Sequence, residues 1–302
     1  MTRVTPHVAA VIVSFNSERH IDALLDSIPA AMDGLPHSVV VVDNGSTDAT
    51  RDVLARRGDC QVVRSTNLGF AAGVNRGVAQ SPPADAVLVL NPDAVLDPGC
   101  VPTMAEVLTG TGAGVVAPRV REQDGSLSPT LRRGPTMARV GGLSFTGLAA
   151  FTERIEQPSA YTTEREVDWA VGAILLIDMA CFDALGGFDE SYFLYSEETD
   201  FCLRARDRGW TTVYTPDAGA MHIGGGSGES ATTHTMKIVN RIRLYRRRHT
   251  TSAAAAYYAL AVVTELRRAV LGHRRSWATL TALVVPSRRP PALHASDSVL
   301  PR

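Results

Sequence analysis

Residues 39–50 read VVVVDNGSTDAT, a run of valines that ends at Asp43 and gives way to turn-forming polar residues. Consecutive β-branched apolar residues predict a strand buried on both faces, which is typical of a parallel sheet covered by helices. Asn-Gly and the Ser, Thr and Asp after it favour a turn and then a helix, with Asp48 as the cap. The stretch therefore predicts a strand, a turn that carries two carboxylates, and a helix.

The first 120 residues repeat this alternation. Strands are predicted at residues 8–14, 38–42, 61–64 and 86–90, and helices at residues 18–28, 48–57 and 71–79. Strands that alternate with helices indicate βαβ units, so we expect an α/β fold with a mostly parallel central sheet and flanking helices.

Polar side chains follow two of the predicted strands. Asp43 and Asn44 end the second strand, and Asn91-Pro92-Asp93 ends the fourth. Ligands of parallel α/β sheets bind beyond the carboxyl ends of the strands, so these groups are expected in one crevice. Carboxylates and turn N–H donors suit a ribose and a divalent metal. For either stretch alone, a plain turn remains the alternative, with Asp48 as the cap of the next helix in the first stretch.

Familiar nucleotide motifs are missing from the sequence. The first predicted strand leads into VSFNSERH at residues 13–20 instead of G-x-G-x-x-G, and no G-x-x-x-x-G-K-[ST] occurs anywhere. NAD-type and P-loop binding therefore lose their main support.

Composition indicates an ordinary globular chain. It has 302 residues, 45% of them hydrophobic and 20% charged, which suits one large α/β domain with an appendage, or two small domains. The cysteines at positions 60, 100, 181 and 202 form no CxxC or Cys/His spacing, so neither a disulfide framework nor a zinc site is expected. The apolar run before Ser14 is too short to form the core of a signal peptide. A cytoplasmic protein is therefore the default expectation.

The charge is divided unevenly along the chain. Residues 237–302 carry 13 Lys and Arg against two acidic residues, a net charge of +11, so residues 1–236 carry −12 of the total of −1. The apolar stretch 253–263 is too short to span a bilayer. Flanked by basic clusters, it suits a helix in the lipid interface at the inner face of the plasma membrane. A helix packed on the N-terminal α/β domain or on a second copy is the alternative, and the absence of interleaved aromatics disfavours nucleic acid.

Several stretches together resemble a known family. They read VIVSFNSERHI (11–21), VVVDNGSTDAT (40–50), NLGFAAGVNRG (67–77), LNPDAV (90–95), WAVGAILLI (169–177), GGFDESYFLYSEETDFCLRARDRGW (186–210) and HIGGGS (222–227). In this order they resemble the family 2 glycosyltransferases of the GT-A fold, within them the bacterial rhamnosyltransferase-like group. The resemblance implies a GT-A catalytic domain over residues 1–235 and a basic, mainly helical region over residues 236–302.

The resemblance also implies the reaction, an inverting transfer of a sugar from a nucleotide-diphosphate donor to an acceptor hydroxyl. Such an enzyme must hold the nucleotide, neutralise the diphosphate and deprotonate the acceptor. The positions that match the family's donor site are Ser14, Phe15, Asn16, Asp43, Asn44, Asn67, Gly69, Asn75 and Asn91.

For the metal, Asp93 matches the family position that ligates Mg²⁺ or Mn²⁺ between the phosphates. Asn91 replaces the first acid of the family's D-x-D motif, which implies a weaker site completed by donor phosphates and water. His222 corresponds to a histidine that completes this site in metal-dependent relatives, and the glycines at 224–226 would let backbone approach a phosphate. An ordinary surface or core histidine is the alternative.

For the base, the family pattern points to the second acid of Glu197-Glu198, with Glu198 in place of the usual Asp. Clustered carboxylates have a raised proton affinity, as a general base needs, although acids in a first helical turn also suit the helix dipole. Glu197 and Asp200 therefore remain open as candidates.

Trp169, Gly172 and Asp189 match the acceptor region of relatives, with a core tryptophan as the alternative for Trp169. Within the family, the sequence is most similar to actinobacterial enzymes that move L-rhamnose from dTDP-rhamnose to a polyprenyl-diphosphate-linked N-acetylglucosamine. Another donor such as UDP-galactofuranose or a UDP-hexose, a nucleotidyl transferase, and a non-catalytic nucleotide-sugar or lipid-binding scaffold remain alternatives. A homo-oligomer is also open.

Overall fold

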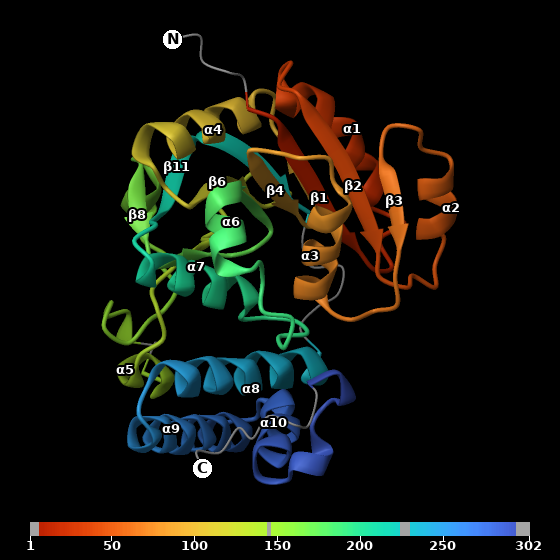
Figure 1. Ribbon diagram of the computed structural model, residues 1–302. Helices are drawn as coiled ribbons and strands as arrows, with labels where there is room; N and C mark the ends of the chain where they lie inside the picture. Colours follow the sequence, from red (N-terminus) through yellow and green to blue (C-terminus); the bar gives the residue numbers. More distant parts are fainter. Residues whose placement is uncertain (1–5, 144–145, 224–229, 294–302) are drawn as a thin grey trace.

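The computed structural model describes residues 6–143, 146–223 and 230–293. The predicted phosphate-facing glycines at 224–226 lie outside the described residues. Figure 1 shows an α/β layer in the upper part of the molecule, with helices on both faces of a sheet, and a helical layer beneath it that contains the C-terminal segment.

The predicted strands of the N-terminal half are present and parallel. Within the described residues the main sheet has nine strands, in the order β3-β2-β1-β4-β10-β6-β11-β5, with β8 paired to β11. Its first four members are parallel, with Ser14 opposite Asp43 and Ile12 opposite Leu90. They are β1 (Val8–Ser14), β2 (His37–Asp43), β3 (Gln61–Arg64) and β4 (Ala86–Leu90).

The second half of the sheet is mixed, because β10 lies antiparallel between β4 and β6. β11 is parallel to β6, and β5 and β8 pair with β11 in the antiparallel sense. The α/β class is thus confirmed, with parallel pairing in the N-terminal half of the sheet. The remaining strands are β5 (Ala94–Leu96), β6 (Val115–Arg121), β8 (Arg165–Val167), β10 (Ile174–Asp178) and β11 (Thr212–His222), and a separate pair consists of β7 (Leu131–Arg132) and β9 (Trp169–Ala170).

Helices cover both faces of the sheet because its strands are apolar on both. Ile12 of β1 belongs to the core beneath α1 and α4, whereas Val11 and Val13 belong to the core beneath α3, α6 and α7. Gly73 and Gly77 allow α3 to approach β1 closely, since an added Cβ would lie 2.7 Å and 2.3 Å from the side chains of Val13 and Val11. The bounds are α1 (Ile21–Met32), α2 (Thr50–Ala55), α3 (Phe70–Gln80), α4 (Cys100–Thr111), α5 (Met137–Val140), α6 (Met179–Leu185) and α7 (Glu197–Asp207), with a 3₁₀ turn at Pro158–Tyr161.

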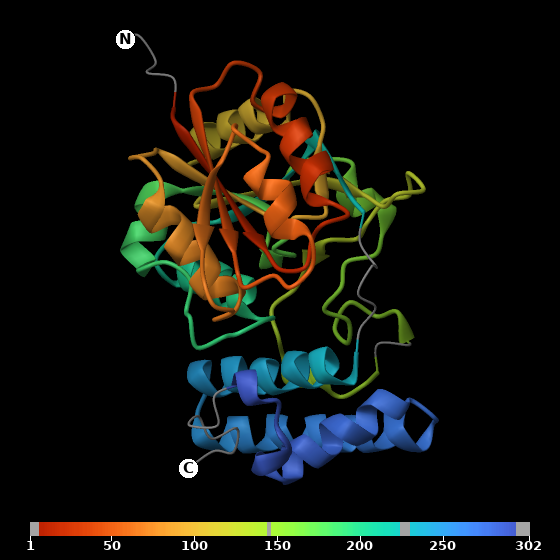
Figure 2. The ribbon, with the colours of Figure 1, turned by 90° about the vertical axis from the view of Figure 1, so that its right-hand side faces the viewer.

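The C-terminal segment forms α8 (Ala231–Arg248), α9 (Thr251–Val270) and α10 (Arg274–Val284), followed by 3₁₀ turns at Pro286–Arg288 and Pro291–Leu293. Ser230 and Thr250 start α8 and α9 as side-chain caps. The expected boundary between residues 235 and 236 falls inside α8. Figure 2 shows α8 between the α/β layer and the remaining helices.

These helices share a core of their own that includes Tyr245, Tyr257 and Leu283, and loop residues 193–195 before α7 pack against it. Within the ranges that the structure describes, none of the helices is both long and apolar enough to span a bilayer.

Candidate active site

The carboxyl ends of β1 and β2 place Ser14 and Asp43 side by side, both fully buried. One oxygen of Asp43 accepts a hydrogen bond from the Ser46 backbone N–H (3.0 Å), and the other accepts one from Arg51 Nε (2.8 Å). Burial opposes ionisation of Asp43, but these hydrogen bonds outweigh it and hold its pKa below the usual value. Asp43 therefore stays charged and orders the turn, and Arg51 is a partner that the sequence did not reveal.

The loop after β1 is tied to the loop after β2. The Asn16 N–H donates to Ser46 Oγ (3.0 Å), and Asn16 Oδ1 accepts from the Thr47 N–H (2.8 Å). Asp48 accepts hydrogen bonds from the Thr50 N–H and hydroxyl, as a capping residue does. Phe15 stands out from this joined loop with 48% of its surface exposed. The two predicted donor-site loops thus form one rigid rim.

The loop before α3 joins this rim to the segment that leads to the acidic motif. Asn44 Nδ2 donates to the Gly69 carbonyl (2.9 Å), and the Gly69 N–H donates to Asn67 Oδ1 (3.1 Å). Gly69 has φ +100°, and a Cβ there would lie 2.4 Å from the Phe193 carbonyl oxygen, which accepts from the Phe70 N–H. Only glycine fits this conformation and this contact, so the sequence-predicted glycine is a structural requirement of the site.

Asp93 and His222 meet at the ends of β4 and β11. Asp93 Oδ1 lies 3.1 Å from His222 Nε2, and the Ile223 N–H donates to the Asp93 carbonyl. This contact raises the pKa of His222; although burial opposes the charge of Asp93, the same contact lowers the pKa of its carboxyl group. A carboxylate oxygen and an imidazole nitrogen at this separation suit neighbouring positions on one Mg²⁺ or Mn²⁺ ion.

Within the described residues, no three His, Cys, Asp or Glu side chains cluster as a metal site. The donor set therefore fits an ion that is held partly by protein and partly by phosphate oxygens and water, as the replacement of the first D-x-D acid by Asn91 implies.

The acidic motif opens α7. Glu198 lines a cavity of about 470 Å³ between the catalytic unit and α8 and α9, whereas Glu197 is absent from the lining and is 4% exposed. Burial raises the pKa of Glu198, and burial followed by repulsion from Glu198 raises that of Glu197 well above its ordinary value. Of the two acids, Glu198 is the one with access to a substrate.

The residues between β9 and β10 lie between Glu198 and the Asn91 end of β4. The Asn91 N–H donates to the Ala173 carbonyl (2.9 Å), and a Cβ at neighbouring Gly172 would lie 3.2 Å from Glu198 Cβ. Gly172 thus leaves the space that the Glu198 side chain occupies. This link depends on the antiparallel insertion of β10 beside β4, which the sequence reading did not anticipate.

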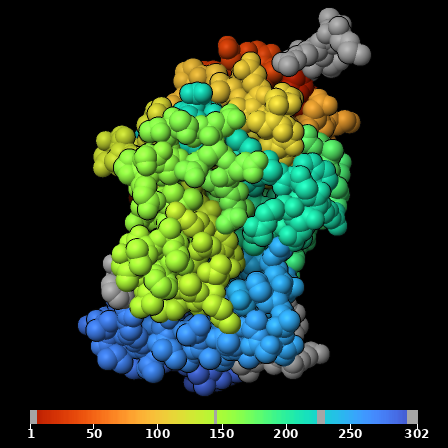
Figure 3. All heavy atoms as spheres, turned by 90° about the vertical axis from the view of Figure 1, so that its left-hand side faces the viewer, coloured from red at the N-terminus to blue at the C-terminus, as the bar shows by residue number. Residues whose placement is uncertain are grey.

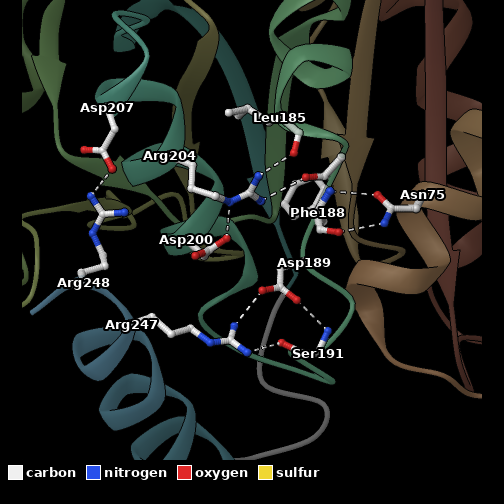
Figure 4. A network of polar contacts seen from close by, with 11 residues as sticks. Asn75, Leu185, Phe188, Asp189, Ser191, Asp200, Arg204, Asp207, Arg247 and Arg248 are labelled. Carbon is white, nitrogen blue, oxygen red and sulfur yellow. Dashed lines mark hydrogen bonds and ion pairs between the residues drawn. The ribbon is translucent and has the colours of Figure 1, made fainter. Parts of the chain in front are cut away.

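Three predicted ligand residues have another place in the structure, visible in Figure 4. Both ends of the Asn75 amide bind the Phe188 backbone (2.8 and 2.9 Å), so the amide secures this loop. Asp189, predicted at the acceptor, pairs with Arg247 of α8 at 2.7 Å. Asp200, a candidate base, pairs with Arg204 at 2.5 Å and is 6% exposed.

These contacts hold residues 185–196 from several sides. Arg204 also donates to the Leu185 and Gly187 carbonyls (2.9 and 3.0 Å). Asn240 of α8 donates to the Leu194 and Tyr195 carbonyls, and the buried Arg243 donates to the Ser191 carbonyl (3.1 Å). The i,i+4 spacing of Asp200 and Arg204 was a readable sign of this pair, but no local signal marks Asn240 or Arg243.

Trp169 is a buried residue at the edge of the cavity. It is 6% exposed, its Nε1 donates to the Arg133 carbonyl (3.1 Å), and the Arg132 guanidinium lies 5.8 Å from its ring. The core alternative therefore describes Trp169 better than a ring stacked on a sugar does.

Comparisons with known proteins agree with this arrangement. The model of the family described as Glycosyltransferase like family 2 matches residues 6–249. The N-acetylglucosaminyl-diphospho-decaprenol L-rhamnosyltransferase of Mycobacterium tuberculosis is 34% identical over 241 residues, 74% of this chain and 76% of that protein. The rhamnosyltransferase WbbL of Escherichia coli is 27% identical over 71% of this chain and 83% of its own length.

Among solved structures, the mannosyltransferase PcManGT of Pyrobaculum calidifontis, in complex with GDP-Man and Mn²⁺, aligns with a TM-score of 0.57 at 16% identity. The alignment covers 96% of this chain and 83% of that one. At this identity the likeness concerns the fold.

Proposed function

The chain belongs to the family 2 glycosyltransferases, and from this premise we propose that it moves L-rhamnose from dTDP-rhamnose to a lipid-diphosphate-linked N-acetylglucosamine. The observation that carries the proposal is the position of Glu198, on the cavity wall and one backbone link away from the Asn91-Pro92-Asp93 end of β4. A base, a phosphate-facing end and an acceptor cavity therefore adjoin. The rhamnosyl donor and the lipid-linked acceptor are supported by the names of the relatives.

In this reaction the acceptor hydroxyl oxygen bonds to the anomeric carbon while the bond from that carbon to the diphosphate oxygen breaks. The hydroxyl proton passes to Glu198, and the bonding electrons leave with dTDP. The raised pKa of Glu198 strengthens it as a proton acceptor. Glu197 is buried next to Glu198. When Glu197 is protonated, it adds no second negative charge beside the base.

Asp93 and His222 would hold a divalent metal at the donor diphosphate. Such an ion neutralises the charge that develops on the leaving phosphate oxygens. The nucleotide would be supported by the buried Asp43 and by the rim of Ser14, Asn16 and Asn44. The exposed Phe15 is available to contact the nucleobase.

We also propose a contact of the C-terminal helices with the inner face of the plasma membrane. Large apolar side chains are exposed along α9 and α10, namely Val263, Leu266, Val270, Leu271, Trp277, Val284 and Val285. The exposed Arg274 lies between Leu271 and Trp277 in sequence, and the exposed Arg288 follows Val285. Apolar groups mixed with cations match an anionic lipid surface. The protein should bind phosphatidylglycerol vesicles more strongly than phosphatidylcholine vesicles, and Val270→Glu should abolish this binding. If instead the protein is a dimer in solution and Val270→Glu disrupts the dimer, a second copy of the chain covers this face.

The test of the reaction compares Glu198→Gln with Glu197→Gln. Removal of a general base lowers kcat by about 10²- to 10⁴-fold, so Glu198→Gln should abolish measurable transfer while leaving the dTDP-rhamnose Kd within about threefold. Glu197→Gln, a matched change one residue away, should retain activity. Transfer by Glu198→Gln at near the wild-type rate would refute the assignment of the base, and selective binding of another nucleotide sugar would replace the donor.

A further inference from the structure

The cavity beside Glu198 is strongly cationic. Its walls carry Arg132, Arg139, Arg154, Lys237, Arg241 and Arg268, against the carboxylates Glu153, Glu198 and Glu265. The cations come from the 132–154 segment and from α8 and α9, which meet on the face shown in Figure 3. A neutral sugar does not require this excess of positive charge, so the cavity is built for an anion.

Two of the cations lack a carboxylate partner. Arg132 Nη1 donates to the Pro129 and Leu131 carbonyls (2.6 and 3.0 Å), and Arg139 Nη1 donates to the Gly134 carbonyl. In the part of the chain that the structure describes, neither guanidinium has a carboxylate at ion-pair distance, and Arg139 Nε is buried without an acceptor. Arg241, in contrast, pairs with Glu153 at 2.9 Å.

The cations also repel one another. Burial, followed by the charge of nearby Arg154, lowers the pKa of Arg132, and Arg241 acts in the same direction. A bound anion would remove this repulsion, and it would be held by charge-assisted hydrogen bonds in the planar geometry that guanidinium groups favour.

The residues proposed to bind the donor diphosphate lie outside this cavity. Asp93, His222, Ser14 and Asp43 are absent from the cavity lining. A second anion site on the far side of Glu198 therefore belongs to the molecule whose hydroxyl Glu198 deprotonates.

Apolar side chains form another part of the wall, namely Val140, Phe151, Ile238, Ile242, Tyr257 and Ala261 from α5, α8, α9 and the loop between β7 and β8. Leu143 and Leu148, which follow α5, are exposed at 37% and 58%. An anion site with an apolar wall next to exposed leucines suits a phosphate group that carries a hydrocarbon chain.

We propose that this cavity binds the diphosphate of a lipid-linked acceptor, with Arg132 and Arg139 as its main ligands and Arg241 beside them. The inference rests on the proposed function, because it takes the acceptor hydroxyl to lie at Glu198. Arg132 and Arg139 then determine which acceptors are used, by requiring a diphosphate between the sugar and the lipid.

The first experiment measures transfer to a short-chain polyprenyl-diphosphate N-acetylglucosamine and to octyl N-acetylglucosaminide, which lacks the diphosphate. In Arg139→Gln, KM for the diphosphate acceptor should rise at least about tenfold, while kcat, the donor KM and the KM for the octyl glycoside stay within about threefold. Arg139→Lys should recover part of the loss. Arg165→Gln, an exposed arginine of a neighbouring cavity that does not line this one, serves as the control and should behave as wild type.

The second experiment needs no turnover. Methylene bisphosphonate is titrated calorimetrically in metal-free buffer, so that it cannot bind through a metal at Asp93. Binding by the wild type and its loss in Arg139→Gln are expected, and they would support the cavity assignment even if no rhamnose transfer were found. Equal binding by both proteins, or an unchanged KM for the diphosphate acceptor in Arg139→Gln, would overturn it while leaving the transfer reaction intact.

Discussion

Replacing Asn240 with alanine tests whether α8 holds the loop that leads to the catalytic base. Asn240 is fully buried and donates to the carbonyls of Leu194 (2.9 Å) and Tyr195 (3.1 Å). Tyr195 and the residue after it, Ser196, both have a positive φ (68° and 78°), although neither is glycine. Directly afterwards α7 begins at Glu197. The side chain of Glu198 thus depends on a strained turn that a residue of α8 stabilises.

The conformational strain of this turn and the stabilisation from the two Asn240 hydrogen bonds are of similar size. A left-handed conformation costs a non-glycine residue about 1–2 kcal/mol, hence about 2–4 kcal/mol for the pair. Each hydrogen bond from Asn240 contributes about 0.5–1.5 kcal/mol net, together about 1–3 kcal/mol. Asn240→Ala also removes an acceptor of Arg243 Nη1 (3.1 Å). The hydrogen bond from the Phe70 N–H to the Phe193 carbonyl and the packing of residues 193–195 remain, so the turn should relax in a share of molecules without unfolding.

Asn240→Ala should therefore lower the free energy of unfolding by about 1–3 kcal/mol and kcat by about tenfold or more, with the donor Kd nearly unchanged. Adding Ser196→Gly removes strain at one position, worth about 1 kcal/mol after the entropic cost of glycine, and should restore kcat about fivefold. Unfolding in urea, steady-state kinetics and donor titration measure these effects, and Thr232→Ala at the exposed start of α8 is the control. An unchanged kcat in Asn240→Ala, or no recovery in the double variant, would refute the reasoning.

Further outcomes are expected from the same structure. Gly69→Ala should destabilise the fold by about 2–5 kcal/mol in urea unfolding, because it adds backbone strain and a clash with the Phe193 carbonyl; Gly34→Ala, with a positive φ but open space around it, should cost only about 1–2 kcal/mol, and equal losses would contradict the clash. Glu197 has a raised pKa in the fold, so stability is lost as pH rises through that pKa. Glu197→Gln should accordingly be more stable than wild type near about pH 9 and lose this advantage near about pH 5, and a constant difference would refute the shift. Asp93→Ala should weaken Mn²⁺-dependent donor binding at least about tenfold but leave metal-free binding unaltered, as calorimetry with and without chelator would show; an equal loss in both conditions would argue against a metal role.

The parts of the fold that the sequence predicted correctly are local in origin. The valine run that ends at Asp43 and the run that ends at Asn91 are readable because a buried strand needs consecutive apolar residues and a turn needs polar ones. The family-like motifs added the order of the site along the chain, and the matching family model confirms the GT-A reading. The roles given to Asp43, Asp93, His222 and Glu198 remain predictions.

Other predicted site residues make contacts that depend on residues far away in sequence. Asn75 binds Phe188, Asp189 pairs with Arg247, and Asp200 combines a local ion pair with burial that only the packed loop creates. Similarly, no periodicity shows that β10 enters the sheet antiparallel between β4 and β6, because strand pairing depends on which edges are left open after earlier strands have paired.

Sequence by itself therefore determined the strand ends, their polar groups and the acidic start of α7, since each follows from hydrophobic periodicity and turn chemistry within a few residues. Tertiary structure decided which acid faces a cavity, which carboxylates are held by arginines, and that cations from the 132–154 segment, α8 and α9 surround one space beside Glu198. The physical reason is that burial and charge pairing act through space, and residues more than 100 positions apart, such as Val140 and Thr264, become neighbours only when the C-terminal helices pack against the rest of the protein.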